Sequence, residues 1–299
     1  MKKFIYSALA ASMLFACSQE EIVDVNKSES QLMTFKVELP ATATSRTVGG
    51  GIEIGAGTQA DNLIYAMYEY GIEDTPVVTG VATDGEDNDG VFTVTVPMAK
   101  DITYDLLFLA YNKDNTAFII NKDDPKTTNL KALKFNASQT PNVDAYDAFV
   151  GSLSNQGVTA ASTTSVKLER PFAQINAATT EQDLIDAKTV KASVIESQLV
   201  IKGVPTTYNV LSGIAEGSQD VTYGATEILN CDAPSGKFTN ETIKVDGKNY
   251  YYLTLAYVLA GKDPSTHEAT FNFFREGREE VSELIILNLP IQRNYRTNV

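Results

Sequence analysis

The sequence has only one histidine and two cysteines in 299 residues. Any catalytic triad that uses histidine must therefore be built on His267, whose neighbours Ser265 and Asp263 lie in the same predicted turn. Neighbouring loop residues rarely give the geometry that a nucleophile, a base and an orienting group require. We therefore predict that His267 is a solvated turn residue. Cys231 has no base nearby in the sequence, and we interpret it as an inert thiol.

Positive charge is also scarce, with 24 lysine and arginine residues against 38 acidic ones and a net charge of -14. Nucleic-acid binding depends on neutralising phosphates with Lys and Arg, so no nucleic-acid partner is expected. Gly49–Gly51 lacks the strand-to-helix context of a dinucleotide site. The acidic loop Asp84–Gly90 does not match the spacing of a calcium-binding EF-hand, and we interpret it as a hairpin connection. No cofactor or metal is predicted, and enzyme activity has no positive support.

A cluster of aromatic residues, Tyr250–Tyr252 with Tyr257 beyond it, offers stacking faces that could hold a sugar. Side chains alternate between the two faces of a strand, so Tyr250 and Tyr252 would share one face and Tyr251 would take the other. Core and surface tyrosines of a β-sandwich explain the same pattern, and we favour that interpretation.

The first residues have the pattern of a secretory signal peptide. The apolar stretch Phe4–Met13 is shorter than the roughly 20 residues that span a bilayer. It leads into Leu14–Cys17, a lipobox that predicts cleavage before Cys17 and a lipid on that cysteine. The alternative is an ordinary signal peptide with a chance cysteine. With Cys17 lipidated, no intramolecular disulfide is possible, and residues 17–30 form a polar, acidic tether.

Beyond the tether, short runs of β-branched and aromatic residues alternate with turn residues, without a sustained helical period. This predicts a mainly β protein with antiparallel sandwich architecture. One helix is predicted at residues 180–187, and it separates an N-terminal domain, 31–180, from a C-terminal domain, 190–299. The predicted strands cover residues 32–39, 63–70, 91–96, 104–111, 166–177, 192–202, 250–259, 269–274 and 283–289.

The segment Ala41–Gly51 consists of small residues around Arg46. Such a segment can open locally and admit a protease. Cleavage after Arg46 by an arginine-specific protease would allow the strand Leu32–Leu39, with Phe35, Val37 and Leu39 on one face, to leave with the tether. The remaining sheet would then expose unpaired backbone groups that a strand from another subunit could fill. The alternative is a flexible loop that is never cut.

Four segments together resemble the fimbrillin-type (type V) pilin lipoproteins of Bacteroidales, the Mfa-like or major fimbrial subunits. They are the lipobox Leu14–Cys17, the arginine after the first strand, Val166–Asn176 and Leu289–Asn298. The resemblance implies two transthyretin-like β-sandwich domains in tandem, export to the outer membrane on lipidated Cys17, maturation at Arg46 and polymerisation by donor-strand exchange. The implied partners are other pilin subunits, tip or anchor subunits included, the outer membrane and the arginine-specific protease.

This resemblance favours a structural subunit of a fimbria at the cell surface. In similar sequences further strand-forming residues commonly follow the run Arg293–Asn298, whereas this sequence stops at Val299. This difference puts in doubt whether the chain donates a strand to a neighbour, and it leaves a terminal subunit or an incomplete gene product as alternatives. The sequence does not distinguish a stalk, tip or anchor role. The alternative function is an anchored surface lipoprotein that binds glycans or acts as an adhesin.

Overall fold

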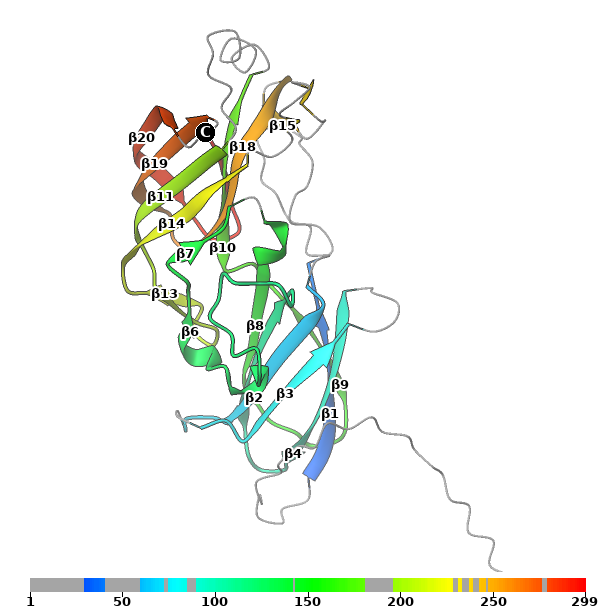
Figure 1. The fold of residues 1–299 in the computed structure, drawn as a ribbon. Coiled ribbons are helices and arrows are strands. Elements are labelled where there is room, and N and C mark those ends of the chain that lie inside the picture. The colour runs from blue at the N-terminus through cyan, green and yellow to red at the C-terminus, as the bar shows by residue number, and fades with distance from the viewer. Residues whose placement is uncertain are drawn as a thin grey trace, which may run out of the picture.

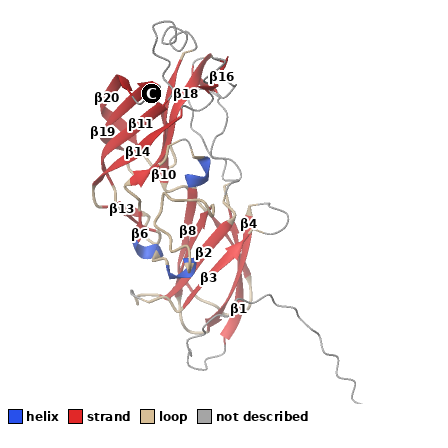
Figure 2. Cartoon of the chain, viewed as in Figure 1, coloured by secondary structure: helices blue, strands red, loops and turns tan. Residues whose placement is uncertain are grey.

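The computed structural model describes residues 30–40, 60–72, 75–84, 90–141, 143–180, 196–227, 231–232, 237–238, 242–245, 247–275 and 279–299. Within these residues the protein is nearly all β, as the sequence predicts (Figure 2). Short 3-10 helices occur at η1 (Pro125–Thr127), η2 (Leu130–Ala132) and η3 (Asp144–Tyr146). The strands are β1 (Ser30–Glu38), β2 (Asn62–Glu69), β3 (Val78–Thr83), β4 (Val91–Ala99), β5 (Tyr104–Tyr111), β6 (Leu133–Lys134), β7 (Ser138–Gln139), β8 (Ala148–Gln156), β9 (Thr163–Lys167), β10 (Phe172–Thr179), β11 (Glu196–Val204), β12 (Thr207–Asn209), β13 (Ile214–Glu216), β14 (Gln219–Glu227), β15 (Cys231–Asp232), β16 (Lys237–Phe238), β17 (Thr242–Val245), β18 (Lys248–Leu259), β19 (Ser265–Arg275), β20 (Glu279–Ile291) and β21 (Arg296–Asn298).

Four sheets make up the body of the protein (Figure 1). Sheet I has the strand order β4-β1-β9, and sheet II has the order β3-β2-β5-β8. Sheet III has the order β17-β18-β10-β21, and sheet IV has the order β20-β19-β11-β14-β7. Sheets I and II lie at one end of the elongated molecule, and sheets III and IV lie at the other (Figure 1). Most neighbours are antiparallel, but β1 with β9, β10 with β21 and β14 with β7 are parallel.

Sheets I and II pack face to face around a first core. The strands of sheet I alternate, so that Phe35 and Val94 are buried while Lys36 and Thr93 are exposed. Alternation of this kind is typical of a sheet with one buried face. This first core consists of apolar residues from β1, β4, β9, β2, β5 and β8, together with a few residues of the connecting loops.

A second core begins on the other face of sheet II. The whole of β5, the run Tyr104–Tyr111, is buried, because its even-numbered residues enter the first core and Leu107, Leu109 and Tyr111 enter the second. The second core then continues without a break through Phe118 and Tyr208 into the space between sheets III and IV. The hairpin of β12 and β13, which pairs with β6, belongs to this connection. Sheet II is therefore shared by both cores.

The predicted strand over residues 166–177 is wrong as one element, because the structure divides it into β9 and β10. Residues 168–171 connect them, and here the chain passes from sheet I to sheet III. Pro171 has no backbone N–H to donate to a ladder, which is why a strand breaks there. The predicted domain boundary between 180 and 190 stays a prediction, and the helix predicted at 180–187 lies outside the described residues apart from Thr180, which is not helical.

The acidic loop after Asp84 is not the hairpin connection that we predicted. It leads from β3 in sheet II to β4 in sheet I, so the two flanking strands belong to different sheets. Asp84 accepts a hydrogen bond through Oδ2 from the backbone N–H of Gly90, at 3.0 Å. Residues 85–89 lie outside the described part. The sequence between the two strands carries no signal that separates a turn within one sheet from a crossing between two.

Tyr223 provides a test of the second core by alkaline titration. Its side chain is buried and its hydroxyl donates to the carbonyl oxygen of Tyr257 at 2.5 Å. Burial raises the pKa of Tyr223 well above 10.0, so above about pH 10 the unfolded chain loses a proton that the folded chain keeps. We expect the free energy of unfolding to fall with rising pH in this range. Tyr223→Phe should make this decline shallower by about 1.4 kcal/mol per pH unit, measured by urea unfolding.

The matched control is Tyr70→Phe, because Tyr70 is 51% exposed. It should leave the slope of stability against pH unchanged. An equal change of slope in both variants would contradict the assignment of Tyr223 to the closed core.

Candidate strand-exchange site

The first strand, β1, lies inside sheet I and not at its edge. It pairs antiparallel with β4 along its whole length, from Ser30 opposite Ala99 to Glu38 opposite Val91. On its other side it pairs parallel with β9, with Thr34 opposite Thr163. From Thr34 to Glu38, both rows of backbone groups of β1 are thus engaged by neighbours. Removing β1 would leave β4 and β9 with facing, unpaired N–H and C=O groups.

The side chains of β1 divide sharply between its two faces. Met33, Phe35 and Val37 are at most 6% exposed and point into the first core, where the ring of Phe35 lies 6.2 Å from that of Phe108. Leu32, on the opposite face, is 61% exposed. Leu39 lies just beyond the end of β1, half-buried against the first core. The space that β1 occupies is therefore a slot with three apolar positions at alternate residues.

Of the sequence-predicted site residues, only those of the first strand are placed. Phe35 and Val37 share the buried face of β1, Leu32 lies on its exposed face, and Leu39 lies just beyond its end. Cys17 and Arg46 lie outside the described residues, so lipidation and maturation stay predictions. The parallel partner β9 was missed, because pairing between segments more than a hundred residues apart leaves no local signal in one sequence.

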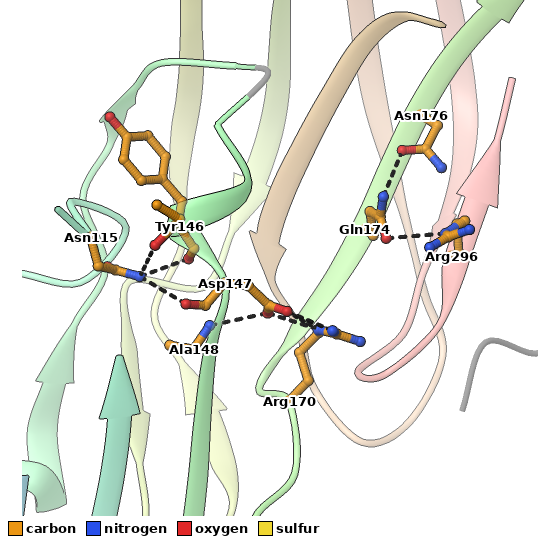
Figure 3. Close-up of polar contacts among 9 residues, drawn as sticks. Asn115, Tyr146, Asp147, Ala148, Arg170, Gln174, Asn176 and Arg296 are labelled. Carbon is orange, nitrogen blue, oxygen red and sulfur yellow. Dashed lines mark hydrogen bonds and ion pairs between the residues drawn. The ribbon is translucent and has the colours of Figure 1, made fainter. Parts of the chain in front are cut away.

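Two of the segments that carry the family resemblance come together in space. The strand β10, from the run 166–176, pairs parallel with β21, from the run 289–298. Gln174 accepts from Arg296 at 3.0 Å and donates to Asn176 at 3.1 Å (Figure 3). Asn176 in turn donates to Asn298 at 2.9 Å. The amides of Gln174 and Asn176 are buried, and burying them without partners would cost about 1–3 kcal/mol each. These hydrogen bonds, which we call the amide ladder, therefore fix the register of β21 against β10.

The turn before β21 is tied to the same region by Arg293. Its guanidinium donates to the hydroxyl of Tyr208 at 2.6 Å and to the carboxylate of Glu169 at 3.0 Å. Burial raises the pKa of Tyr208, while the charge of Arg293 acts in the opposite direction. This contact joins the C-terminal turn, the β12–β13 hairpin and the connection between β9 and β10.

The connection between β9 and β10 also carries a buried ion pair. Arg170 and Asp147 are 7% and 3% exposed, and Arg170 Nε donates to Asp147 Oδ1 at 2.7 Å (Figure 3). The guanidinium also lies 5.3 Å from the ring of Phe149. Asn115 donates to the backbone carbonyls of Tyr146 and Asp147 at 2.8 and 3.1 Å, and so positions this segment. The pair links the start of β8 to the connection between β9 and β10, where the chain passes from sheet I to sheet III.

The remaining candidates from the sequence lie on three strands, β19, β18 and β15. His267 lies on β19, half-buried, and not in a solvated turn as predicted. Its ring contacts Ser265 Oγ at 2.9 Å and the carbonyl of Lys202 at 2.9 Å. Tyr257 is buried in the second core and cannot present a stacking face, while Tyr250 is half-buried on β18. Only the backbone of Cys231 is described, in β15.

The family of unknown function DUF6562 matches residues 25–299. The chain belongs to this family. No curated protein matches it. Within the part of the chain that the structure describes, no helix is long and apolar enough to cross a membrane.

Fimbrial proteins are among the solved structures to which the chain is similar. A candidate adhesin from Bacteroides ovatus is 11% identical over 85% of this chain and 76% of its own, with a TM-score of 0.47. The C-terminally truncated tip fimbrial protein Mfa3 from Porphyromonas gingivalis is 13% identical over 86% and 82%, with a TM-score of 0.43. The fimbrial anchor protein Mfa2 from the same organism is 9% identical over 85% and 82%, with a TM-score of 0.44.

The slot predicts a large difference between two substitutions on one strand. Phe35→Ala removes a fully buried ring and should lower the free energy of unfolding by about 3–5 kcal/mol. Leu32→Ala, three residues away on the exposed face, should change it by less than about 0.5 kcal/mol. Urea unfolding of the two variants measures both values. Similar losses in the two variants would contradict the inward orientation of Phe35.

The buried ion pair predicts that removing one partner lowers the stability of the protein more than removing both. Arg170→Met leaves the buried Asp147 carboxylate without this guanidinium and should cost about 3–5 kcal/mol of stability. Replacing both residues, as Asp147→Leu with Arg170→Met, should cost less than the single change, because no buried charge remains. The exposed pair Lys202–Glu268 is the control, and Lys202→Met should cost at most about 1 kcal/mol by the same urea measurement. A double variant no more stable than Arg170→Met would contradict this account.

Proposed function

We propose that this chain is a structural subunit of a cell-surface fimbria. It is exported as a lipoprotein on Cys17, cut after Arg46 by an arginine-specific protease, and assembled by donor-strand exchange. The observation that carries the proposal is the position of β1, which is an inner strand of sheet I and the first strand after the tether. The predicted cleavage site follows this strand closely. One cut there would separate β1 from the covalent body of the protein.

The geometry of the slot supports strand exchange, because it defines what an incoming strand must be. The strand must run antiparallel to β4 and parallel to β9, as β1 does. Its side chains must be apolar at three alternate positions, and the middle position must fill the space of Phe35. Main-chain hydrogen bonds would supply affinity, and the pockets would supply specificity.

The strand β21 does not meet these requirements. Its residues Arg296, Thr297 and Asn298 are polar, and they are engaged in the ladder on β10. In this proposal β21 stays in place, and the donor strand is an alternating apolar segment from a neighbouring subunit, either another copy of this chain or a tip or anchor subunit. The outer membrane holds the precursor through the lipid before cleavage.

Limited proteolysis tests the proposal directly. The mature chain that begins at Cys17 is treated with an arginine-specific protease, and fragment masses and size-exclusion profiles are recorded. We expect a single cut after Arg46, followed by oligomers that resist mild denaturant, because an inserted strand adds a full hydrogen-bond ladder. The variant Arg46→Ala should remain intact and monomeric.

A competitor peptide separates strand exchange from nonspecific association. A synthetic peptide with the sequence of Ser30–Glu38 should suppress oligomers when added in excess, whereas the same peptide with Phe35→Asp should not. Absence of a cut after Arg46, or a cut that leaves a stable monomer, would refute the fimbrial proposal and favour an anchored adhesin.

A further inference from the structure

A small cavity opens beside sheet II, at the end where β2 begins and β5 ends. Its volume is about 200 Å³. Pockets for drug-sized ligands measure about 300–1,000 Å³, so this cavity suits a molecule the size of one sugar ring. Its lining residues come from β2, β5 and the loop after β5, and they are Asn62, Tyr111, Lys113, Asn115, Ile120, Lys122 and Pro125.

The lining is positively charged, although the chain as a whole carries a net charge of -14. Lys113 and Lys122 line the cavity, and no Asp or Glu does. Within the described part of the chain, neither lysine forms an ion pair. The carboxylate of Asp61, which is adjacent to the lining residue Asn62, already accepts from Asn62 and from the backbone N–H of Lys113. The two ammonium groups are thus available to an anion.

The cavity also offers groups for neutral parts of a ligand. The structure gives the Tyr111 hydroxyl no hydrogen-bond partner among the described residues. Burial and the nearby Asp61 charge raise the pKa of Tyr111, so it is a phenol and can donate a hydrogen bond. Asn62 uses its amide N–H on Asp61, which leaves its carbonyl oxygen as an acceptor. Ile120 and Pro125 add an apolar surface.

The walls of the cavity are held in place before any ligand arrives. Asn115 donates to the carbonyls of Ala145, Tyr146 and Asp147 and accepts from the backbone N–H of Phe118. The turn before it is closed by Asn112, which accepts from the N–H groups of residues 114 and 115. A preorganised site loses less conformational entropy when it binds.

From this combination we infer that the cavity binds a carboxylate-bearing sugar unit, such as a hexuronate residue of an acidic glycan. The carboxylate lies between Lys113 and Lys122, ring hydroxyls bond to Tyr111 and Asn62, and the apolar face of the ring packs on Pro125. This site goes beyond the fimbrial function and does not depend on strand exchange. It gives the subunit a ligand of its own.

Saturation-transfer NMR with the chain that begins at Cys17 tests the inference. The probes are glucuronate, glucose and acetate, and titration gives a dissociation constant for each. We expect glucuronate to bind at least tenfold more tightly than glucose or acetate, and to weaken as salt rises. Lys113→Met combined with Lys122→Met should raise the dissociation constant for glucuronate at least tenfold. Lys126→Met is the matched control, because Lys126 lies in the same loop but does not line the cavity.

A second variant tests recognition of the ring. Tyr111→Phe should weaken glucuronate binding while leaving the weak binding of acetate unchanged. No binding of glucuronate, equal binding of glucuronate and acetate, or unchanged binding in the double lysine variant would each overturn the inference. Cleavage after Arg46 is not needed for any of these measurements, so failure here leaves the fimbrial proposal standing, and the reverse also holds.

Discussion

The burial of the inner strands of sheet II, β2 and β5, on both faces is the constraint on which the rest of the structure depends. Its strand β5 directs alternate residues into two different cores, one shared with sheet I and one that extends to sheets III and IV. A strand without a solvent face needs apolar residues at nearly every position, and the run Leu106–Ala110 provides them. The two ends of the molecule are joined through this sheet, by packing as well as by the chain connection.

If β1 is exchanged as we propose, this arrangement confines the loss of packing to one core. Its buried side chains, Met33, Phe35 and Val37, belong to the first core alone. The second core, which includes Phe172 stacked on Phe118 at 4.9 Å, contains no residue of β1. Loss of β1 would therefore open one side of sheet I while the packing that joins the four sheets stays in place. Our proposal therefore expects the second core to stay folded when β1 leaves.

The sequence predicts local pattern well and distant pairing poorly. The alternation of β1 and the apolar run of β5 identify both strands to within about two residues. The division at Pro171 and the crossing after Asp84 were missed, because each depends on which sheet a strand joins. The surroundings of the His267 and Tyr257 side chains could not be predicted either, because they are formed by residues of β11 and β14.

The candidate site likewise has local features that the sequence predicts and distant pairings that it does not. Phe35 and Val37 were predicted from period-two alternation, which is a property of the strand itself. The slot needs β4 and β9 around that strand, and β9 is separated from it by more than a hundred residues. The amide ladder could not be predicted for the same reason. Gln174 and Arg296 come into contact only because β10 and β21 lie side by side. The family resemblance identified the two segments that contain these residues. The structure shows that the two segments are in contact.

The slot and the cavity use opposite faces of one strand. Phe108 of β5 faces the ring of Phe35 in the first core, whereas Tyr111, three residues later, lies on the second-core side and lines the cavity. Exchange of β1 acts on the first face and leaves the second, with its fixed loop around Asn115, unchanged. If both proposals hold, sheet II separates assembly from ligand binding, and a subunit joined into a fimbria by its slot would keep its cavity accessible to a ligand.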